Sequence, residues 1–240
     1  MIINLKRRED RRINIKKKLD ELNVDYEIFD AVDGYSQDNQ KIFEAYLKMP
    51  IDHEQSPFYD KRNKIKNLFS PGAIGLLKSY EGILQDAIFK EYKRILVLED
   101  DAIFRKNFNQ EFDEFVTNLS FENWKLLLLG ASQNRWDEPG CLEFPKGLKG
   151  VYFPKRTHGA FAIGIDSSIY HEIIGQLSPY YAAFDNGAQP FIYSKYFKKC
   201  FVAFPNLIIA DVSTSDIRMN RNQYFFAHNA RWEMELYDYP

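Results

Sequence analysis

The sequence predicts an α/β fold in which a mostly parallel central sheet is flanked by helices. Short apolar runs suited to buried strands recur along the chain, and stretches with apolar residues at helical spacing separate them. The N-terminal order of strand, helix and strand is typical of a parallel βαβ unit. With 240 residues, 45% of them hydrophobic, the chain can bury one large core, so we expect a single domain over residues 1–240.

The N-terminal third predicts two strands and two helices. Residues 2–5 form a short apolar strand, and "REDRRINIKKKLDELN" carries Ile15 and Leu19 on one helical face. Residues 26–29 form a second strand, which "DAVDG" closes as a turn, and residues 36–48 predict a helix. "KMPIDHEQSPFYDKRNKIKNLF" has no clean period, so we expect a long surface loop there.

Helices and strands continue to alternate along the rest of the chain. Pro71 begins a helix in "SPGAIGLLKSYEGILQDAIFK", which leads into the buried strand of "RILVLEDD". Residues 109–119 predict a helix, whereas "WKLLLLG" and "GAFAIGI" predict strands. Asp166 caps a following helix, and "NGAQPFIYSKYFK" predicts another. "CFVAFPNLIIAD" is strand-like as far as Pro205, and no regular element is predicted from Ser213 onward.

The composition excludes several classes of protein. Lys and Arg number 32 against 34 Asp and Glu, a net charge of −2 that argues against a sequence-independent grip on nucleic acid. No apolar run approaches the ~20 residues of a membrane span. The start, "MIINLKRRED", has no signal-peptide core. We therefore expect a soluble or cytoplasmic protein.

The stretch "RILVLEDDAIF" runs a buried strand into Glu99, Asp100 and Asp101. Unpaired buried carboxylates are costly, so a cation is expected nearby. The carboxyl end of a central parallel strand is also where open α/β sheets bind ligands. Glu99 and Asp101 share one face and suit Mg²⁺ or Mn²⁺, with a substrate phosphate completing the shell. The alternative is that these acids only cap helices and form loop salt bridges.

Seven motifs in order resemble glycosyltransferase family 25, the lipooligosaccharide and collagen galactosyltransferase relatives. They are "IINLKRREDR", "FDAVDG", "SPGAIGLLKSYEGIL", "ILVLEDDAIF", "THGAFAIGI", "FDNGAQPF" and "FPNLIIADVSTSDI". Two departures stand out: Ser79-Tyr80 occupies a position where the family often has Ser-His, and "GAFAIGI" lacks a tyrosine common after its alanine.

The resemblance implies a GT-A fold and inverting transfer of galactose or glucose from a UDP-sugar to a glycan or a hydroxylysine-type protein acceptor. It implies that Asp101, supported by Glu99, holds Mn²⁺ (or Mg²⁺), and that Asp185 is the catalytic base. The third metal ligand is left open between Asp211, Ser215 and His228. The residues implied to bind the donor are Asn4, Arg7, Arg8, Arg12, Asp33, Gly72, Ser79, Asp100, His158 and Gln189.

Several of these residues have a structural alternative. We expect at most two of the three arginines to contact the nucleotide, the rest being solvated helix charges. Asp33 is equally suited to a turn, His158 to a structural hydrogen bond and Asp185 to the N-terminal cap of the helix near Gly187.

Two other functions compete with sugar transfer. A metal-dependent phosphatase or nucleotidyltransferase would also use carboxylates after a parallel strand, although no P-loop pattern occurs. A degenerate nucleotide-sugar-binding or lectin-like protein would retain the fold without turnover, because function depends on the site and not on the fold.

Overall fold

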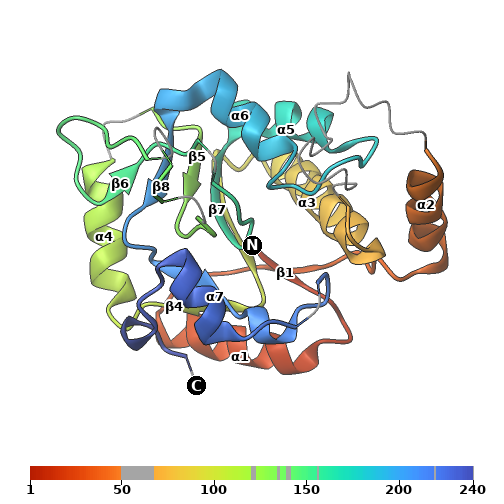
Figure 1. Ribbon diagram of the computed structural model, residues 1–240, viewed down its shortest axis with the longest axis horizontal. Helices are drawn as coiled ribbons and strands as arrows, with labels where there is room; N and C mark the ends of the chain where they lie inside the picture. Colours follow the sequence, from red (N-terminus) through yellow and green to blue (C-terminus); the bar gives the residue numbers. More distant parts are fainter. Residues whose placement is uncertain are drawn as a thin grey trace.

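The computed structural model describes residues 1–49, 68–119, 123–133, 136–138, 142–155, 157–218 and 220–239. In this part of the chain a seven-stranded sheet forms the centre of the molecule (Figure 1). Its strands, in spatial order, are β2 (Ile28–Asp30), β1 (Ile2–Asn4), β3 (Arg94–Glu99), β7 (Ala162–Asp166), β5 (Leu126–Leu128), β8 (Cys200–Ala203) and β6 (Val151–Tyr152).

The sheet is mixed but mostly parallel, as predicted. β1 pairs in parallel with β2 and β3, and β5 pairs in parallel with β8. β7 runs antiparallel to both β3 and β5, so these two neighbours point the same way, and β6 at the edge runs antiparallel to β8. The strand predicted from "GAFAIGI" is therefore the one central strand of opposite direction among the described residues.

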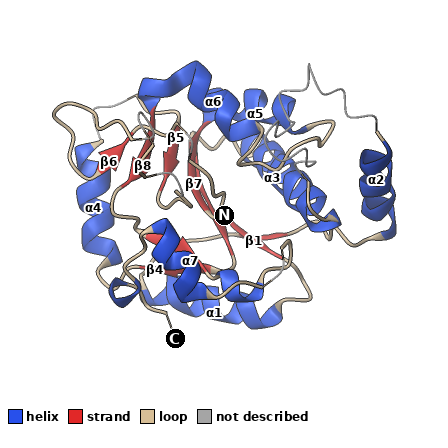
Figure 2. Cartoon of the chain, in the orientation of Figure 1, coloured by secondary structure: helices blue, strands red, loops and turns tan. Residues whose placement is uncertain are grey.

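Helices cover both faces of this sheet (Figure 2). Their bounds are α1 (Glu9–Glu21), α2 (Gln37–Lys48), α3 (Pro71–Phe89), α4 (Phe108–Asn118), α5 (Tyr170–Leu177), α6 (Ala188–Tyr196) and α7 (Gln223–Ala230). Short 3₁₀ turns occur at Ser167–Ile169, Phe197–Lys199, Val212–Thr214 and Met234–Leu236. No helix among the described residues is both long enough and apolar enough to cross a membrane.

Alternation along the strands divides the core into two parts. In β1, Ile3 packs with α3, α5 and α6, whereas Ile2 packs with α1 and α4 on the other face. In β3, Val97 and Leu98 divide in the same way. Because successive side chains of a strand point to opposite faces, each short strand serves both cores. The strands are thus apolar on both faces, which is the pattern the sequence shows.

Most predicted elements are present, and the structure adds four short elements that were not predicted: β4 (Ala102–Phe104), β6 (Val151–Tyr152), β9 (Ile208–Ala210) and α7. β9 pairs antiparallel with β4, and α7 occupies a region where no element was predicted. α7 is short and its apolar residues lack a helical period, but Asn222 caps it by accepting from the Phe225 N–H at 2.8 Å. The predicted long loop, residues 48–69, lies mostly outside the described residues.

The small ribbon of β4 and β9 positions the site. Its register pairs Ala102 with Ala210, and the Asp211 N–H donates to the Asp101 carbonyl at 2.9 Å. The C-terminal segment is thereby fixed beside the carboxyl end of β3, although the two are over a hundred residues apart in sequence. A contact between two segments so far apart in the chain cannot be inferred from the sequence of either one.

Candidate active site

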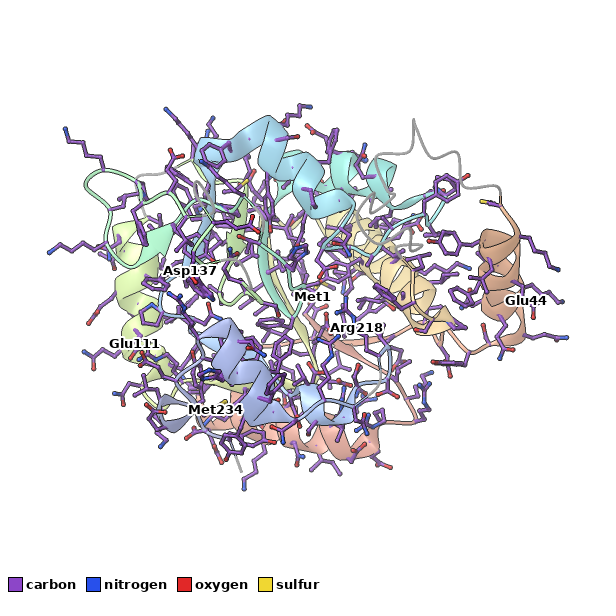
Figure 3. The ribbon with its side chains drawn as sticks, viewed as in Figure 1. Met1, Glu44, Glu111, Asp137, Arg218 and Met234 are labelled. Carbon is purple, nitrogen blue, oxygen red and sulfur yellow. The ribbon has the colours of Figure 1, made fainter. Side chains whose placement is uncertain are left out.

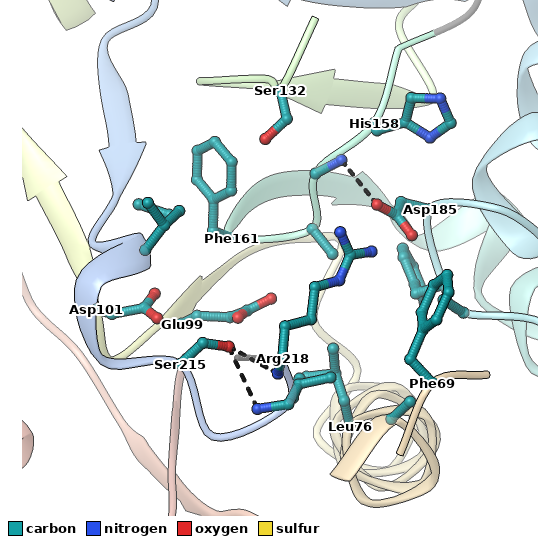
Figure 4. A pocket seen from close by; sticks show the side chains of 18 of the residues that line it. Phe69, Leu76, Glu99, Asp101, Ser132, His158, Phe161, Asp185, Ser215 and Arg218 are labelled. Carbon is teal, nitrogen blue, oxygen red and sulfur yellow. Dashed lines mark hydrogen bonds between the residues drawn. The ribbon is translucent and has the colours of Figure 1, made fainter. Parts of the chain in front are cut away.

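Two connected cavities open at the carboxyl ends of β1 and β3. The large cavity has a volume of about 530 Å³ and the small cavity about 80 Å³. Glu99, Asp101 and Ser215 line both, so the acidic end of β3 forms the junction (Figure 4). Asp100 lines only the small cavity, and it lies with Asp101 in the turn between β3 and β4.

The two junction carboxylates are mostly buried and poorly compensated. Burial, followed by the charges of Asp101, Asp100 and Asp185, raises the pKa of Glu99 well above its ordinary value. Burial also raises the pKa of Asp101 to about 7, although the charge of Arg11 opposes the shift. The Oδ1 atom of Asp101 is buried and has no hydrogen-bond partner among the described residues. Such an arrangement is costly unless a cation compensates it.

Arg11 supplies part of the missing positive charge. Its Nη1 lies 2.9 Å from Oδ1 of Asp100 and 3.2 Å from Oδ2 of Asp101, and its Nη2 donates to Oγ1 of Thr214 at 2.9 Å. The guanidinium therefore joins α1, the end of β3 and the C-terminal segment. Arg11 was not among the residues predicted for the site. The signal was present, because Arg11 lies four residues before Ile15 on the face of α1 that packs against the sheet.

A network of charges surrounds the small cavity. Arg7 donates to Asp33 at 2.6 Å and to Asp216 at 3.1 Å. The buried amide of Asn4 donates to Asp100 at 2.7 Å. These residues converge from β1, the turn after β2 and the segment after β9, so the predicted donor residues Asn4, Arg7, Asp33 and Asp100 do come together.

The N-terminal half of α3 forms another wall of the small cavity. Gly72 faces the C-terminal segment, where an added Cβ would lie 3.0 Å from the Asp216 carbonyl oxygen. Ser79 is fully buried, accepts from the Val32 N–H at 2.9 Å and donates to the Gly75 carbonyl. Gly72 and Ser79, both predicted to bind the donor, do line the small cavity. Both residues are also small enough for α3 to pack closely against its neighbours.

Asp185 and His158 line the large cavity and not the small one. The Asp185 Oδ2 accepts from the Gly159 N–H at 3.2 Å (Figure 4). The N-terminal cap of α6 is Gly187, with no side-chain cap bond, so the capping alternative for Asp185 is wrong. Asp185 instead fixes the turn that leads into β7.

Four predicted donor residues line neither cavity: Asn4, which only contacts Asp100, and Arg8, Arg12 and Gln189. Arg8 pairs with Asp10 and Asp216, and Arg12 lies 3.7 Å from Asp30. Gln189 is buried and donates to the Gly159 carbonyl at 2.9 Å, where it supports the same turn as Asp185. The sequence placed these residues near the correct elements but could not give the direction of each side chain.

Among the candidates for a third metal ligand, Asp211 and Ser215 line the large cavity and His228, on α7, does not. Asp211 already accepts from the Ser213 N–H at 2.8 Å. No three His, Cys, Asp or Glu side chains converge as a complete metal site within the described ranges. Mg²⁺ and Mn²⁺ at phosphate-transfer sites often take only one or two carboxylates. Glu99 and the unpartnered Asp101 oxygen fit that smaller ligand set.

Comparison with known proteins gives one family. The model described as "Glycosyltransferase family 25 (LPS biosynthesis protein)" matches residues 1–145. Procollagen galactosyltransferase 1-A of Xenopus laevis is 29% identical over 140 residues, which are 58% of this chain and 22% of that protein. Procollagen galactosyltransferase 2 of Homo sapiens is 28% identical over 140 residues, 58% of this chain and 21% of that protein.

A third relative has a different description. "Inactive glycosyltransferase 25 family member 3" of Homo sapiens is 28% identical over 149 residues, 61% of this chain and 24% of that protein. The chain thus spans less than a quarter of the length of each of these relatives. The matched region contains the strands and helices around the small cavity and the acidic end of β3, whereas Asp185 and the segment after β9 lie beyond the family-model match.

Proposed function

Because the chain belongs to glycosyltransferase family 25, we propose that it is an inverting, metal-dependent glycosyltransferase that moves galactose or glucose from a UDP-sugar. The acceptor is a hydroxyl group of a glycan or of a hydroxylysine-bearing protein. One observation carries the proposal: a small cavity lined by arginine and aspartate side chains and a larger open cavity meet at two mostly buried, incompletely compensated carboxylates.

The small cavity suits one part of the nucleotide, because its volume of about 80 Å³ is too small for a whole UDP. Asp33 offers a carboxylate to uracil or ribose hydroxyls, and Arg7 offers a guanidinium to phosphate. The diphosphate then lies toward Glu99 and Asp101, the residues that would hold Mn²⁺ or Mg²⁺. A bound metal would supply a Lewis acid for the charge that develops on the leaving UDP. The site offers these residues from several elements, so their positions depend on the intact fold.

The large cavity suits the acceptor. Inversion in one step requires attack from the face opposite the leaving group, and the attacking hydroxyl must lose its proton there. Asp185 lines this cavity, and the hydrogen bond from the Gly159 N–H fixes its carboxylate. We assign it the role of accepting that proton.

The test uses the full chain with UDP-galactose and UDP-glucose in separate reactions. Released UDP is measured by mass with Mn²⁺, without added metal and with excess chelator. We expect UDP release that requires the metal, with one of the two donors preferred. Full turnover in excess chelator would contradict metal dependence, and failure to release UDP from any donor would contradict the enzyme assignment.

A nucleotide-sugar-binding protein without turnover is the second candidate. It is favoured by the contact of Arg11 with Asp101, since an internal cation already satisfies one oxygen of that carboxylate. One relative is described as inactive, although that description applies to the relative alone. UDP binding by calorimetry, combined with no UDP release at any metal concentration, would identify this function.

A further inference from the structure

Two arginines at the mouth of the large cavity differ from the other described arginines. Arg7, Arg8, Arg11, Arg12, Arg94, Arg105 and Arg231 each form a salt bridge with a carboxylate. Arg218 and Arg221 form none with any described residue. Surface guanidinium groups usually find a carboxylate or remain fully solvated, so two unpaired ones beside a cavity are candidates for ligand binding.

The two side chains are held in place against aromatic rings. The guanidinium carbon of Arg218 lies 5.3 Å from the centre of the Phe69 ring, and that of Arg221 lies 5.4 Å from the centre of the Phe226 ring. These distances are within the range of cation–π contacts, which leave the edge of each guanidinium free to donate hydrogen bonds. Figure 4 shows the Arg218 side chain extending into the cavity.

The backbone that carries both residues is also fixed. The Arg218 N–H donates to the Ser215 hydroxyl at 3.0 Å, and the Arg221 N–H donates to the Val212 carbonyl at 3.0 Å. Burial and repulsion from Arg218 lower the pKa of Arg221, which agrees with two guanidinium groups held near one another without a countercharge. An anion between them would remove that repulsion.

The position of Arg218 and Arg221 indicates which of the two substrates they contact. Arg218 and Arg221 line the large cavity and an outer groove of about 570 Å³ next to it, but neither lines the small cavity. A nucleotide in the small cavity approaches the junction from the side of β1. The outer groove borders both cavities, but Asp185 and the two arginines line the large cavity together. A ligand in the large cavity therefore reaches all three, and in the proposed reaction that ligand is the acceptor.

We infer that Arg218 and Arg221 form a specificity site for an acceptor that carries a phosphate or carboxylate group. The inference rests on the proposed function, and it chooses an acidic glycan over a hydroxylysine-bearing peptide. The two positive charges attract an acidic acceptor and repel a basic one before it reaches Asp185. A guanidinium can also donate two parallel hydrogen bonds to two oxygens of either acid group.

The test measures binding of three matched sugars to the full chain saturated with UDP and Mn²⁺. Glucose is neutral, whereas glucose 6-phosphate and glucuronate each add one acidic group. We expect at least one acidic sugar to bind roughly tenfold or more tightly than glucose, the amount that one charge-assisted hydrogen bond contributes. Arg218→Gln and Arg221→Gln should each abolish most of this preference and leave the affinity for UDP unchanged.

Arg231→Gln is the matched control. Arg231 is also exposed and lies over an aromatic ring, with its guanidinium carbon 5.3 Å from the centre of the Trp136 ring. Its salt-bridge partner Asp137 lies far from Arg218 in Figure 3. This variant should keep the full preference for the acidic sugars, and the melting temperatures of all three variants should show that they are folded.

Three outcomes would overturn the inference. These are equal binding of all three sugars by the unaltered chain, an undiminished acidic preference in both cavity variants, and a loss of UDP affinity in those variants. The last would identify the donor diphosphate as the anion. Failure of the proposed function is separate, since it would appear as absent UDP binding or absent UDP release by the unaltered chain.

Discussion

The two cavities differ in how their acidic residues are compensated. The acids that line only the small cavity, Asp33, Asp100 and Asp216, each pair with an arginine. The acids that line only the large cavity, Asp185 and Asp211, accept from backbone N–H groups and a hydroxyl. The shared residues at the junction are the most strained electrostatically, because burial raises the pKa values of both.

This difference separates carboxylates that already have a cationic partner in the fold from carboxylates that do not. The paired charges of the small cavity are satisfied by the fold itself and hold its three walls together. The carboxylates of the junction and the large cavity lack a full set of cationic partners, and a protein retains such groups mainly where a ligand or a reaction needs them. Substitutions should therefore affect turnover at the junction and stability in the paired network.

The largest effect is expected at the junction. Asp101→Asn removes one charge from the proposed metal site without changing its shape. Turnover should fall on the order of 1,000-fold, since a Lewis acid contributes several kcal/mol to stabilising the leaving group. The affinity for UDP should lose its dependence on Mn²⁺, measured by calorimetry. Asp113→Asn, at an exposed position on α4, is the control and should change neither quantity. An Asp101→Asn variant with normal turnover would remove this residue from the mechanism.

The next effect is expected in the large cavity. Asp185→Asn keeps an oxygen to accept from the Gly159 N–H, so the turn and the melting temperature should be preserved. The loss of a proton acceptor should reduce kcat about 100-fold and leave the affinity for UDP intact. Steady-state kinetics and UDP titration separate the two quantities. Near-normal kcat in the folded variant would redirect the search to Asp211 and Asp216.

The paired network should respond in stability. Arg11→Met leaves Asp100 and Asp101 without their shared cation, and we expect a loss of about 2 kcal/mol in the free energy of unfolding, below the full cost for a completely buried pair. Arg12→Met is the matched control. Its pair with Asp30 is exposed and long, so it should cost less than about 0.5 kcal/mol. Urea denaturation measures both, and equal losses would contradict the distinction between the two arginines.

The smallest effect concerns Asp166, at the opposite end of the β3–β7 pair. Burial alone would raise its pKa, but hydrogen bonds from Ser168 and Arg94 and the charge of Lys125 outweigh burial and lower it. A lowered pKa stabilises the fold above the ordinary carboxyl range, and this stabilisation is lost as the pH falls through the folded value.

Asp166→Asn should therefore be less stable than the unaltered chain at neutral pH, by about 0.5 kcal/mol after allowance for solvent screening. The difference should shrink as the pH falls below about 4, where the unaltered carboxyl also becomes protonated. Denaturation curves at several pH values test this. A difference that stays constant with pH would show that packing, and not charge, is responsible.

Much of the fold followed from local patterns. The strands predicted before and after α1 are β1 and β2, which pair with one another in parallel. Ile15 and Leu19 of α1 are buried, as their spacing predicted. The elements β4, β6, β9 and α7 were missed because each is short and none has a clear period. For such elements, the partner strand and the cap contribute more than the intrinsic preference of the residues.

The site was predicted in part. The acidic end of β3, Asn4, Arg7 and Asp33 line the small cavity or contact the residues that do. Arg11 was missed, and the side chains of Arg8, Arg12 and Gln189 point away from the two cavities. Neighbouring residues of a helix project in different directions, so the element alone does not give the direction of a side chain.

The sequence by itself determined the alternation of strands and helices and the presence of three carboxylates after a buried strand. Both are local properties, set by hydrophobic period and by residue order. Only the tertiary structure decided which charges meet. Arg11 reaches Asp100 because α1 packs across the end of β3, and Arg218 reaches the large cavity because β9 pairs with β4. These contacts join residues far apart in the chain, and their energies depend on burial and distance, which no local pattern records.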